Sequence, residues 1–359
     1  MLDSCAAKRA TSIYLASGTI PMFPWQLAGG PMSLLEGCDC YAMSFGIDLD
    51  NSGMPQGDPI ITPSSRSVNI RSVVDETECT SCHDEQQREA ELAMLYTLAQ
   101  RHRQWRLSQG AIEINLPECN LKVDDVNLEQ PEIAFERVDW ASPARQLVAE
   151  CMIMASGAAG SFGAAEQVAL PYRGQRQPVL PAAEDLESIF PGPSRLVAIR
   201  SRMTPSITEP SPSPHASLGL QAYVQVTSPI RRYSDLVAHY QLKAHVAGQK
   251  LPFTHEGIRD ITNAVGSRVK SSVRLSRESD RYWVAQYFQQ QPQEAVFSAV
   301  FLRWLREDSR LGIVLVEDIA REIPIKMQRN VQLGEPLFIK CIDVDAPNLT
   351  VKLAEAKMA

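Results

Sequence analysis

Two adjacent arginines, Arg231 and Arg232, lie in the segment Thr-Ser-Pro-Ile-Arg-Arg-Tyr-Ser-Asp-Leu, residues 227–236. A planar guanidinium can hold a phosphate through two parallel hydrogen bonds. The free N–H groups at the start of a helix add to the same positive site. If a helix begins here, the pattern predicts a phosphate-binding site. Spacing alone also allows a capped surface helix whose arginines are only solvated.

The same segment contains residues that commonly begin a helix. Thr227 or Ser228 can cap the helix, and Pro229 suits its first turn. The apolar face would then carry Leu236, Tyr240 and Val246. We therefore predict a helix that starts directly after the cap and places both arginines in its first turn.

A second basic feature lies in residues 266–281, where four basic side chains recur at intervals of four, three and four. They are Lys270, Arg274, Arg277 and Arg281. Apolar residues at matching intervals form a neighbouring face: Ile258, Ile261, Val265, Val269 and Val273. The pattern predicts a core-packed helix with a basic outer edge. A solvated face with local ion pairs to Glu278 and Asp280 fits equally well.

Composition limits the class of protein. The 359-residue chain is 44% apolar and 21% charged, enough for one large domain or two ordinary ones. Its formal net charge of −7 leaves nucleic-acid binding open only where positive charge gathers locally. It has no 18-residue apolar run, and its first residues lack the apolar core of a signal peptide. We expect a cytoplasmic protein without membrane contact.

The eight cysteines are scattered through a large chain without a secretion signal, which favours reduced thiols. One tetrahedral zinc site is conceivable, from Cys38, Cys40, Cys79, Cys82 and His83. The first cysteine pair has only one intervening residue, and there is no second CxxC pair. The sequence therefore gives a zinc site little support.

The pattern of elements is mixed. The sequence predicts a strand over residues 41–49 and helices over residues 84–104 and 143–154. These elements predict a sheet lying between and beneath helices. The Pro/Ser-rich residues 204–217 have the composition of a linker between domains, and the glutamine-rich residues 289–294 offer a second boundary.

Five short β-type runs follow that second boundary. They are residues 295–304, 311–316, 322–326, 336–344 and 349–353. Five strands in about sixty residues are typical of a small barrel of the OB or S1 type, which often binds single-stranded nucleic acid. A purely structural β-domain is the alternative. We expect an α+β chain that ends in a five-stranded barrel.

With these pieces in place, the segment from Tyr223 to Leu236 resembles the hallmark of the ribonuclease II/ribonuclease R (RNB domain) family of 3′-to-5′ exoribonucleases. Other segments agree in order: residues 2–3, 9–15, 20–24, 147–155 and 208–220. The resemblance implies an RNB-type catalytic domain over residues 1–288 and an S1-like domain over residues 295–357. It also makes the Pro-rich stretch a loop inside the catalytic domain.

The resemblance further implies hydrolysis of single-stranded RNA with Mg²⁺ held by aspartates. Arg231 would contact the scissile phosphate, and Arg232 would hold the backbone or the local fold. Tyr14 would set the 3′-terminal nucleotide, and Glu278 would contact its ribose, which favours RNA over DNA. The remaining residues expected to bind RNA are Ser228, Tyr233, Lys270, Arg274 and Arg277.

The family's magnesium-binding aspartates lie upstream of the segment that matches this chain, so no metal ligand is expected among its residues. Asp39, Asp48 and Asp50 form only a weak trio near a strand. Val74 replaces a substrate-clamping tyrosine, and Ala149 interrupts a glutamate pair that ends at Glu150. We therefore expect impaired activity. The alternatives are a non-catalytic RNA-binding protein and one part of a split enzyme completed by a separate polypeptide.

Overall fold

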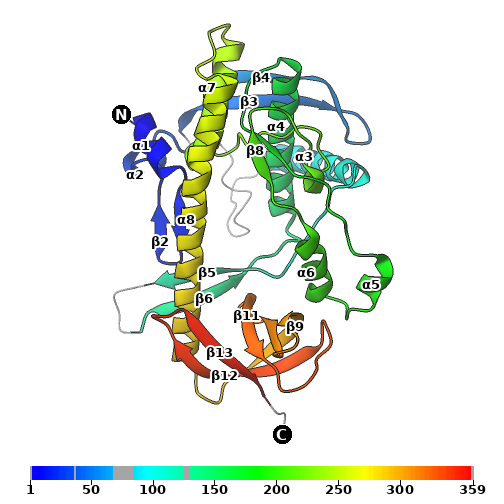
Figure 1. Ribbon diagram of the computed structural model, residues 1–359. Helices are drawn as coiled ribbons and strands as arrows, with labels where there is room; N and C mark the ends of the chain where they lie inside the picture. The colour runs from blue at the N-terminus through cyan, green and yellow to red at the C-terminus, as the bar shows by residue number, and fades with distance from the viewer. Residues whose placement is uncertain (1, 36–37, 68–83, 125–129, 357–359) are drawn as a thin grey trace.

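The computed structural model describes residues 2–35, 38–67, 84–124 and 130–356, and it combines helices, strand pairs and a barrel (Figure 1). The helices are α1 (Leu2–Arg9), α2 (Trp25–Ala28), α3 (Asp84–Ser108), α4 (Pro143–Ala165), α5 (Ala183–Glu187), α6 (Pro193–Arg202), α7 (Tyr233–Val246) and α8 (His255–Gln290). The predicted α+β class is confirmed. The helices predicted over residues 84–104 and 143–154 are confirmed as well, and each extends further at its C-terminal end.

The strands before the barrel form four separate antiparallel pairs in the described residues, not one mixed sheet. They are β1 (Ile13–Leu15) with β2 (Gly18–Ile20), β3 (Asp39–Leu49) with β4 (Pro55–Ser67), β5 (Cys119–Asp124) with β6 (Glu132–Arg137), and β7 (Tyr172–Gly174) with β8 (Ile207–Glu209). Four of these strands have only three residues.

The last part of the chain is a closed barrel with the strand order β10-β11-β13-β12-β9. Its strands are β9 (Val296–Arg306), β10 (Leu311–Val316), β11 (Arg321–Lys326), β12 (Pro336–Asp345) and β13 (Thr350–Glu355). In β11, Ile323 and Ile325 are buried and their neighbours are not, which is the alternation expected of a barrel wall. The predicted five-stranded barrel is therefore confirmed.

Helix α7 begins at Tyr233, not directly after a cap at Thr227 or Ser228. The buried carboxylate of Asp235 accepts a hydrogen bond from the Ser228 N–H, so residues 228–232 form a turn before the helix. The predicted apolar face is also wrong in part, because Val246 is 39% exposed. The helix instead buries two faces, which carry Tyr233 and Val237 on one side and Ala238 and Leu242 on the other.

Helix α8 links the two halves of the molecule (Figure 1). Its 36 residues span roughly 54 Å at about 1.5 Å per residue. Ile258 and Val265 pack beside α1 and α7 near its N-terminal end, as the apolar pattern predicts, but Val273 of the same predicted face is 43% exposed. Val284 and Phe288 enter the core of the barrel near its C-terminal end. One continuous helix therefore fixes the barrel relative to the arginine segment.

The Pro/Ser-rich stretch is part of the fold and not a linker. Strand β8 lies inside it and pairs with β7. The Gln175 side chain donates to the Thr204 carbonyl and accepts from the Ser217 N–H, which ties down both ends of the stretch. Composition suggested a linker because proline and serine are common in linkers. Composition carries no information about the residues elsewhere in the chain that bond to this stretch.

Helix α4 is long and apolar enough to span a membrane by length and composition alone. In the structure, 44% of this apolar window is buried inside the protein. A Cβ atom at Gly160 would meet the backbone of Ala222 and Tyr223 at 2.7–2.8 Å, and one at Gly163 would meet Leu170 at 2.3 Å. The small residues of α4 therefore allow close contact with the segments that surround it.

A buried ion pair joins α4 to α3. The Glu150 carboxylate accepts hydrogen bonds from Arg106 Nε at 2.7 Å and Nη2 at 2.5 Å, and it contacts His102 Nδ1. All three residues are at least 96% buried. Arg106 also donates to the Leu218 carbonyl, so this cluster holds the 215–220 loop in place. Burial by itself would raise the pKa of Glu150, but the hydrogen bonds and charges of Arg106 and His102 hold it below its usual value.

Glu150→Gln should lower the free energy of unfolding by about 3 to 5 kcal/mol, because it leaves the buried Arg106 charge unpaired. Urea titration at pH 7 measures the loss. Glu136→Gln is the matched control, since its pair with Lys122 is more than half exposed and should contribute less than about 1 kcal/mol. Equal effects of the two substitutions would contradict this role for Glu150.

The contribution of Glu150 should also depend on pH. A carboxyl whose pKa is lowered by folding stabilises the protein above its unfolded pKa, and that stabilisation disappears as the pH falls toward the folded pKa. The difference in unfolding free energy between wild type and Glu150→Gln should therefore be full at pH 7 and shrink below about pH 4.3. Urea titrations across the acid range measure it, and a difference that grows on acidification would contradict the assignment.

Candidate functional site

Residues 228–232 form a tight turn that presents the two arginines. The Ser228 carbonyl accepts the N–H groups of Arg231 at 3.1 Å and Arg232 at 2.9 Å. The turn is joined to the start of the chain, because the Arg231 carbonyl accepts from the Ser12 N–H and from Thr11 Oγ1, both at 3.0 Å. These contacts bring together residues about 220 positions apart.

The two arginines have different surroundings. The Arg232 guanidinium holds Asp235 through Nε at 3.0 Å and Nη2 at 2.7 Å, and the Asp235 side chain is fully buried. Arg231 is exposed, and its guanidinium has no hydrogen-bond or ion-pair partner among the residues that the structure describes. Arg231 is therefore free to bind a ligand, whereas Arg232 is already paired.

Arg231 lines a cleft of about 650 Å³. The walls come from the β1 segment, the start of β5, the arginine turn and one face of α8. Three sequence-predicted residues line the cleft besides Arg231: Tyr14, Arg232 and Arg277. The Tyr14 ring is 52% exposed, and the Val123 N–H donates to the Ala16 carbonyl, which joins the β5 and β1 walls.

Helix α8 lines the cleft with residues spaced by three and one. They are Val269, Ser272, Val273, Ser276, Arg277 and Asp280. At about 100° per residue they share one face over roughly 17 Å of helix. Lys270, Arg274 and Arg281 lie farther round the helix and are exposed outside the cleft lining, so the predicted basic edge contributes only Arg277.

The other predicted residues are placed elsewhere. Glu278 pairs with Arg274 at 2.7 Å outside the cleft lining, which matches the predicted local ion pair. Ser228 is buried under its turn, and Tyr233 is buried with its hydroxyl donating to Asp3. The structure therefore gathers four of the nine predicted site residues in the cleft and leaves five outside its lining.

The charges along the cleft are only partly compensated. Asp280 pairs with Arg321 of the barrel at 2.9 Å, and Arg232 pairs with Asp235. Arg231 and Arg277 have no partner among the described residues. The cleft therefore carries two guanidinium groups and one carboxylate, that of Glu118, without a partner among the described residues, and Tyr14 is exposed in the same lining. The excess positive charge and the aromatic ring suit a phosphate-bearing ligand with a flat base.

Sequence reasoning missed several residues that line the cleft: Glu118, Asn120, Ser272, Ser276 and Arg321. The two serines could have been found from the helical period, since they lie one turn apart beside Arg277. Arg321 gave no signal, because its partners lie 41 and 202 positions away in the sequence.

No group of three or more His, Cys, Asp or Glu side chains in the described part of the chain is placed to hold a metal ion. Asp50 caps the turn of the β3–β4 hairpin by accepting from Ser52 and Met54, and these hydrogen bonds lower its pKa. The residues present therefore do not fit a magnesium site. Val74, Cys79, Cys82 and His83 lie outside the described residues, and the six described cysteines are free thiols.

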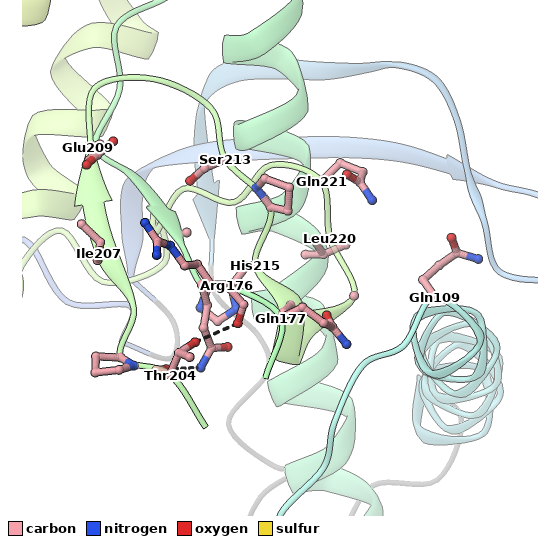
Figure 2. Close-up of a pocket in the computed structure, with 16 residues that line it drawn as sticks. Gln109, Arg176, Gln177, Thr204, Ile207, Glu209, Ser213, His215, Leu220 and Gln221 are labelled. Carbon is pink, nitrogen blue, oxygen red and sulfur yellow. Dashed lines mark hydrogen bonds between the residues drawn. The ribbon is translucent and has the colours of Figure 1, made fainter. Parts of the chain in front are cut away.

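A second pocket, of about 790 Å³, lies between the end of α3 and strand β8 (Figure 2). Its side chains are mainly amides and apolar groups, with Arg176 and Glu209 of opposite charge. Burial, together with the Arg173 charge, lowers the pKa of His215 to about 4, so this imidazole is neutral at pH 7. The pocket has no excess positive charge and contains no sequence-predicted site residue. The arginine-lined cleft is therefore the stronger candidate for phosphate binding.

The chain matches known proteins along its whole length. An uncharacterized ribonuclease of Synechocystis sp. is 42% identical over 357 residues, which cover 99% of this chain and 52% of that protein. The chloroplastic/mitochondrial ribonuclease II of Arabidopsis thaliana is 32% identical over 343 residues, 94% of this chain and 42% of that protein. The chain thus spans about half the length of the curated relatives it matches.

The fold agrees with these matches. Ribonuclease R of Mycoplasma genitalium, solved with ribose-methylated single-stranded RNA, superposes with a TM-score of 0.82 at 19% identity, over 99% of this chain and 64% of that one. Residues 1–248 match the family model described as the RNB domain. On this evidence, the chain belongs to the RNB domain family.

Proposed function

We propose that the cleft binds the 3′ end of single-stranded RNA and that the chain takes part in hydrolysis of the strand in the 3′-to-5′ direction. The observation that carries the proposal is that two guanidinium groups, those of Arg231 and Arg277, lie in one cleft with Tyr14 and have no partner in the described part of the chain. Two phosphates can each neutralise one guanidinium, and a base can stack on the tyrosine ring. Relatives named as ribonucleases support the choice of RNA.

Within the cleft, Arg231 is the residue proposed to contact the scissile phosphate. Its backbone is fixed by Ser12 and Thr11, so the guanidinium starts from a defined position. A positioned cation stabilises the charge that develops on phosphate oxygens during hydrolysis. Arg232 keeps the turn in shape through Asp235 and is a positioning residue for Arg231.

The family resemblance implies magnesium, which supplies an activated water and stabilises the leaving oxygen when bound. The described residues do not fit that ion, so its ligands would come from other residues of the protein or from a separate polypeptide. Glu278 is not proposed as a ribose contact in this arrangement, because it pairs with Arg274 outside the cleft lining. Asn120, Ser272 and Ser276 are better placed to bond hydroxyl groups there.

A second candidate function is RNA binding without hydrolysis. It is favoured by the contrast between a cationic cleft and the lack of a metal-holding group in the described ranges. Both functions require RNA in the cleft, so binding is tested before cleavage. The S1-like barrel is proposed as an additional surface for the same strand.

Arg231→Ala and Arg277→Ala should each weaken binding of single-stranded RNA by roughly tenfold at 0.1 M salt. Each should also reduce the slope of log K against log salt by about 0.7, because one phosphate contact is lost. Filter binding over a series of salt concentrations measures both quantities. Arg274→Ala is the matched control on the same helix, and a loss as large as that of Arg277→Ala would contradict the cleft.

The proposed reaction predicts that a 5′-labelled RNA strand is shortened one nucleotide at a time from its 3′ end in Mg²⁺. Arg231→Ala should slow this shortening by about 10³-fold or more, because the phosphate loses its cation. Gel electrophoresis of timed samples measures the rate. RNA that is bound but stays intact would show that this chain alone does not hydrolyse it, as expected of a non-catalytic RNA-binding protein or of one part of a split enzyme. Internal cuts would contradict both.

Arg232→Ala should lower the free energy of unfolding by about 3 kcal/mol, because it leaves the Asp235 carboxylate buried and unpaired. Arg231→Ala should change it by less than about 0.5 kcal/mol, since its side chain is exposed. Urea titration of the two variants measures both values. Similar losses would show that the neighbouring arginines do not divide structural and binding roles as proposed.

A further inference from the structure

The barrel reaches the cleft through one side chain. Arg321 is the first residue of β11, and it lines the same cleft as Arg231. Its side chain is 19% exposed. A barrel residue therefore belongs to the proposed RNA site, although nearly all of that site comes from the preceding part of the chain.

Arg321 joins three elements. Its Nε and Nη2 atoms donate to the two carboxylate oxygens of Asp280 on α8 at 3.0 and 2.9 Å. Its Nη1 atom donates to the Cys119 carbonyl at the start of β5, also at 2.9 Å. The guanidinium lies 5.6 Å from the centre of the Phe135 ring on β6. It therefore connects both long walls of the cleft, α8 and β5.

The rest of the β5–β6 hairpin is held by the same region. Leu121 and Phe135 pack against the barrel core, and Arg137 donates to the Glu317 carbonyl of the barrel at 3.0 Å. Gln290, at the end of α8, donates to the Pro131 carbonyl just before β6. The hairpin wall of the cleft is thus positioned by contacts with the barrel and the end of α8.

We propose that Arg321 is a positioning residue through which the barrel sets the separation of the two cleft walls. The proposal rests on the function proposed above and adds a role for the barrel apart from its own surface. Arg321 is not a phosphate ligand in this proposal, because Asp280 neutralises its charge and its remaining hydrogen bonds go to the carbonyls of Cys119, Ile319 and Ala320. Only an arginine can donate two hydrogen bonds to the Asp280 carboxylate and a third to the Cys119 carbonyl, because its donors lie in a planar fork. A lysine ammonium is a compact point charge and lacks this geometry.

The geometry gives a distinctive signature in RNA binding. Arg321→Lys, which keeps a positive charge beside Asp280, should weaken RNA binding by about tenfold, because the walls that hold Arg277 and Asn120 lose their fixed spacing. The salt slope should stay at the wild-type value, since no phosphate contact is removed. A fall in slope of about 0.7 would show a direct phosphate contact and overturn the positioning role. Unchanged affinity would also overturn it.

A second readout needs no RNA. The thiol of Cys119 is 3% exposed, and the carbonyl of the same residue is held by Arg321. Arg321→Ala should speed the reaction of Cys119 with a small thiol reagent by tenfold or more, while Cys341 in the barrel keeps its rate. Labelling followed by mass spectrometry of peptides measures both thiols. An unchanged Cys119 rate would show that Arg321 does not position β5.

Arg329→Ala is the matched control. Arg329 also bridges two acids, Glu335 and Glu355, but both lie in the barrel region and none of the three residues lines the cleft. This variant should change neither RNA affinity nor the Cys119 rate. If wild type fails to bind RNA but Arg321→Ala still speeds the reaction of the Cys119 thiol, the proposed function fails and the positioning role stands. If wild type binds RNA and neither substitution at Arg321 changes its readout, only the positioning role fails.

Discussion

The arrangement of the cleft depends on which groups donate hydrogen bonds to one buried carboxylate. Asp235 has no exposed surface, and it accepts from the Ser228 N–H and from the Arg232 guanidinium. A buried carboxylate is tolerated only with such partners, so the chain must fold into a turn before α7 can begin. The same turn leaves Arg231 without an acid beside it. The pairing of one arginine thus makes the other available for phosphate.

Helix α8 extends this local arrangement across the molecule. It packs beside the arginine turn through Ile258 and Val265, and it enters the barrel core through Val284 and Phe288. The cleft face lies between these two anchors. A helix held at both ends cannot rotate one part of its surface independently of another, so the backbone that carries Arg277 keeps a constant position relative to the arginine turn.

The elements governed by local patterns could be predicted from sequence. Short β-type runs indicated all five barrel strands, and helical spacing indicated α3, α4 and α8. The start of α7 was predicted wrongly. Thr227 and Ser228 are typical cap residues, but the Ser228 N–H instead donates to the buried carboxylate of Asp235, and the helix begins at Tyr233. The Glu150–Arg106 and Arg321–Cys119 contacts join residues 44 and 202 positions apart, and no local pattern reports them. For the same reason, Tyr14, Arg231 and Arg277 could be placed in one site only through the resemblance.

The continuity of α8 also limits which changes in chain length the protein can accept. Adding or deleting one residue between Val265 and Val284 would turn everything beyond it by about 100° and shift it by about 1.5 Å. Phe288 would then point away from the barrel core, and Asp280 would no longer face Arg321. Substitutions on the exposed side of the helix carry no such penalty. Over evolutionary time, this stretch should therefore vary in composition while its number of residues stays the same.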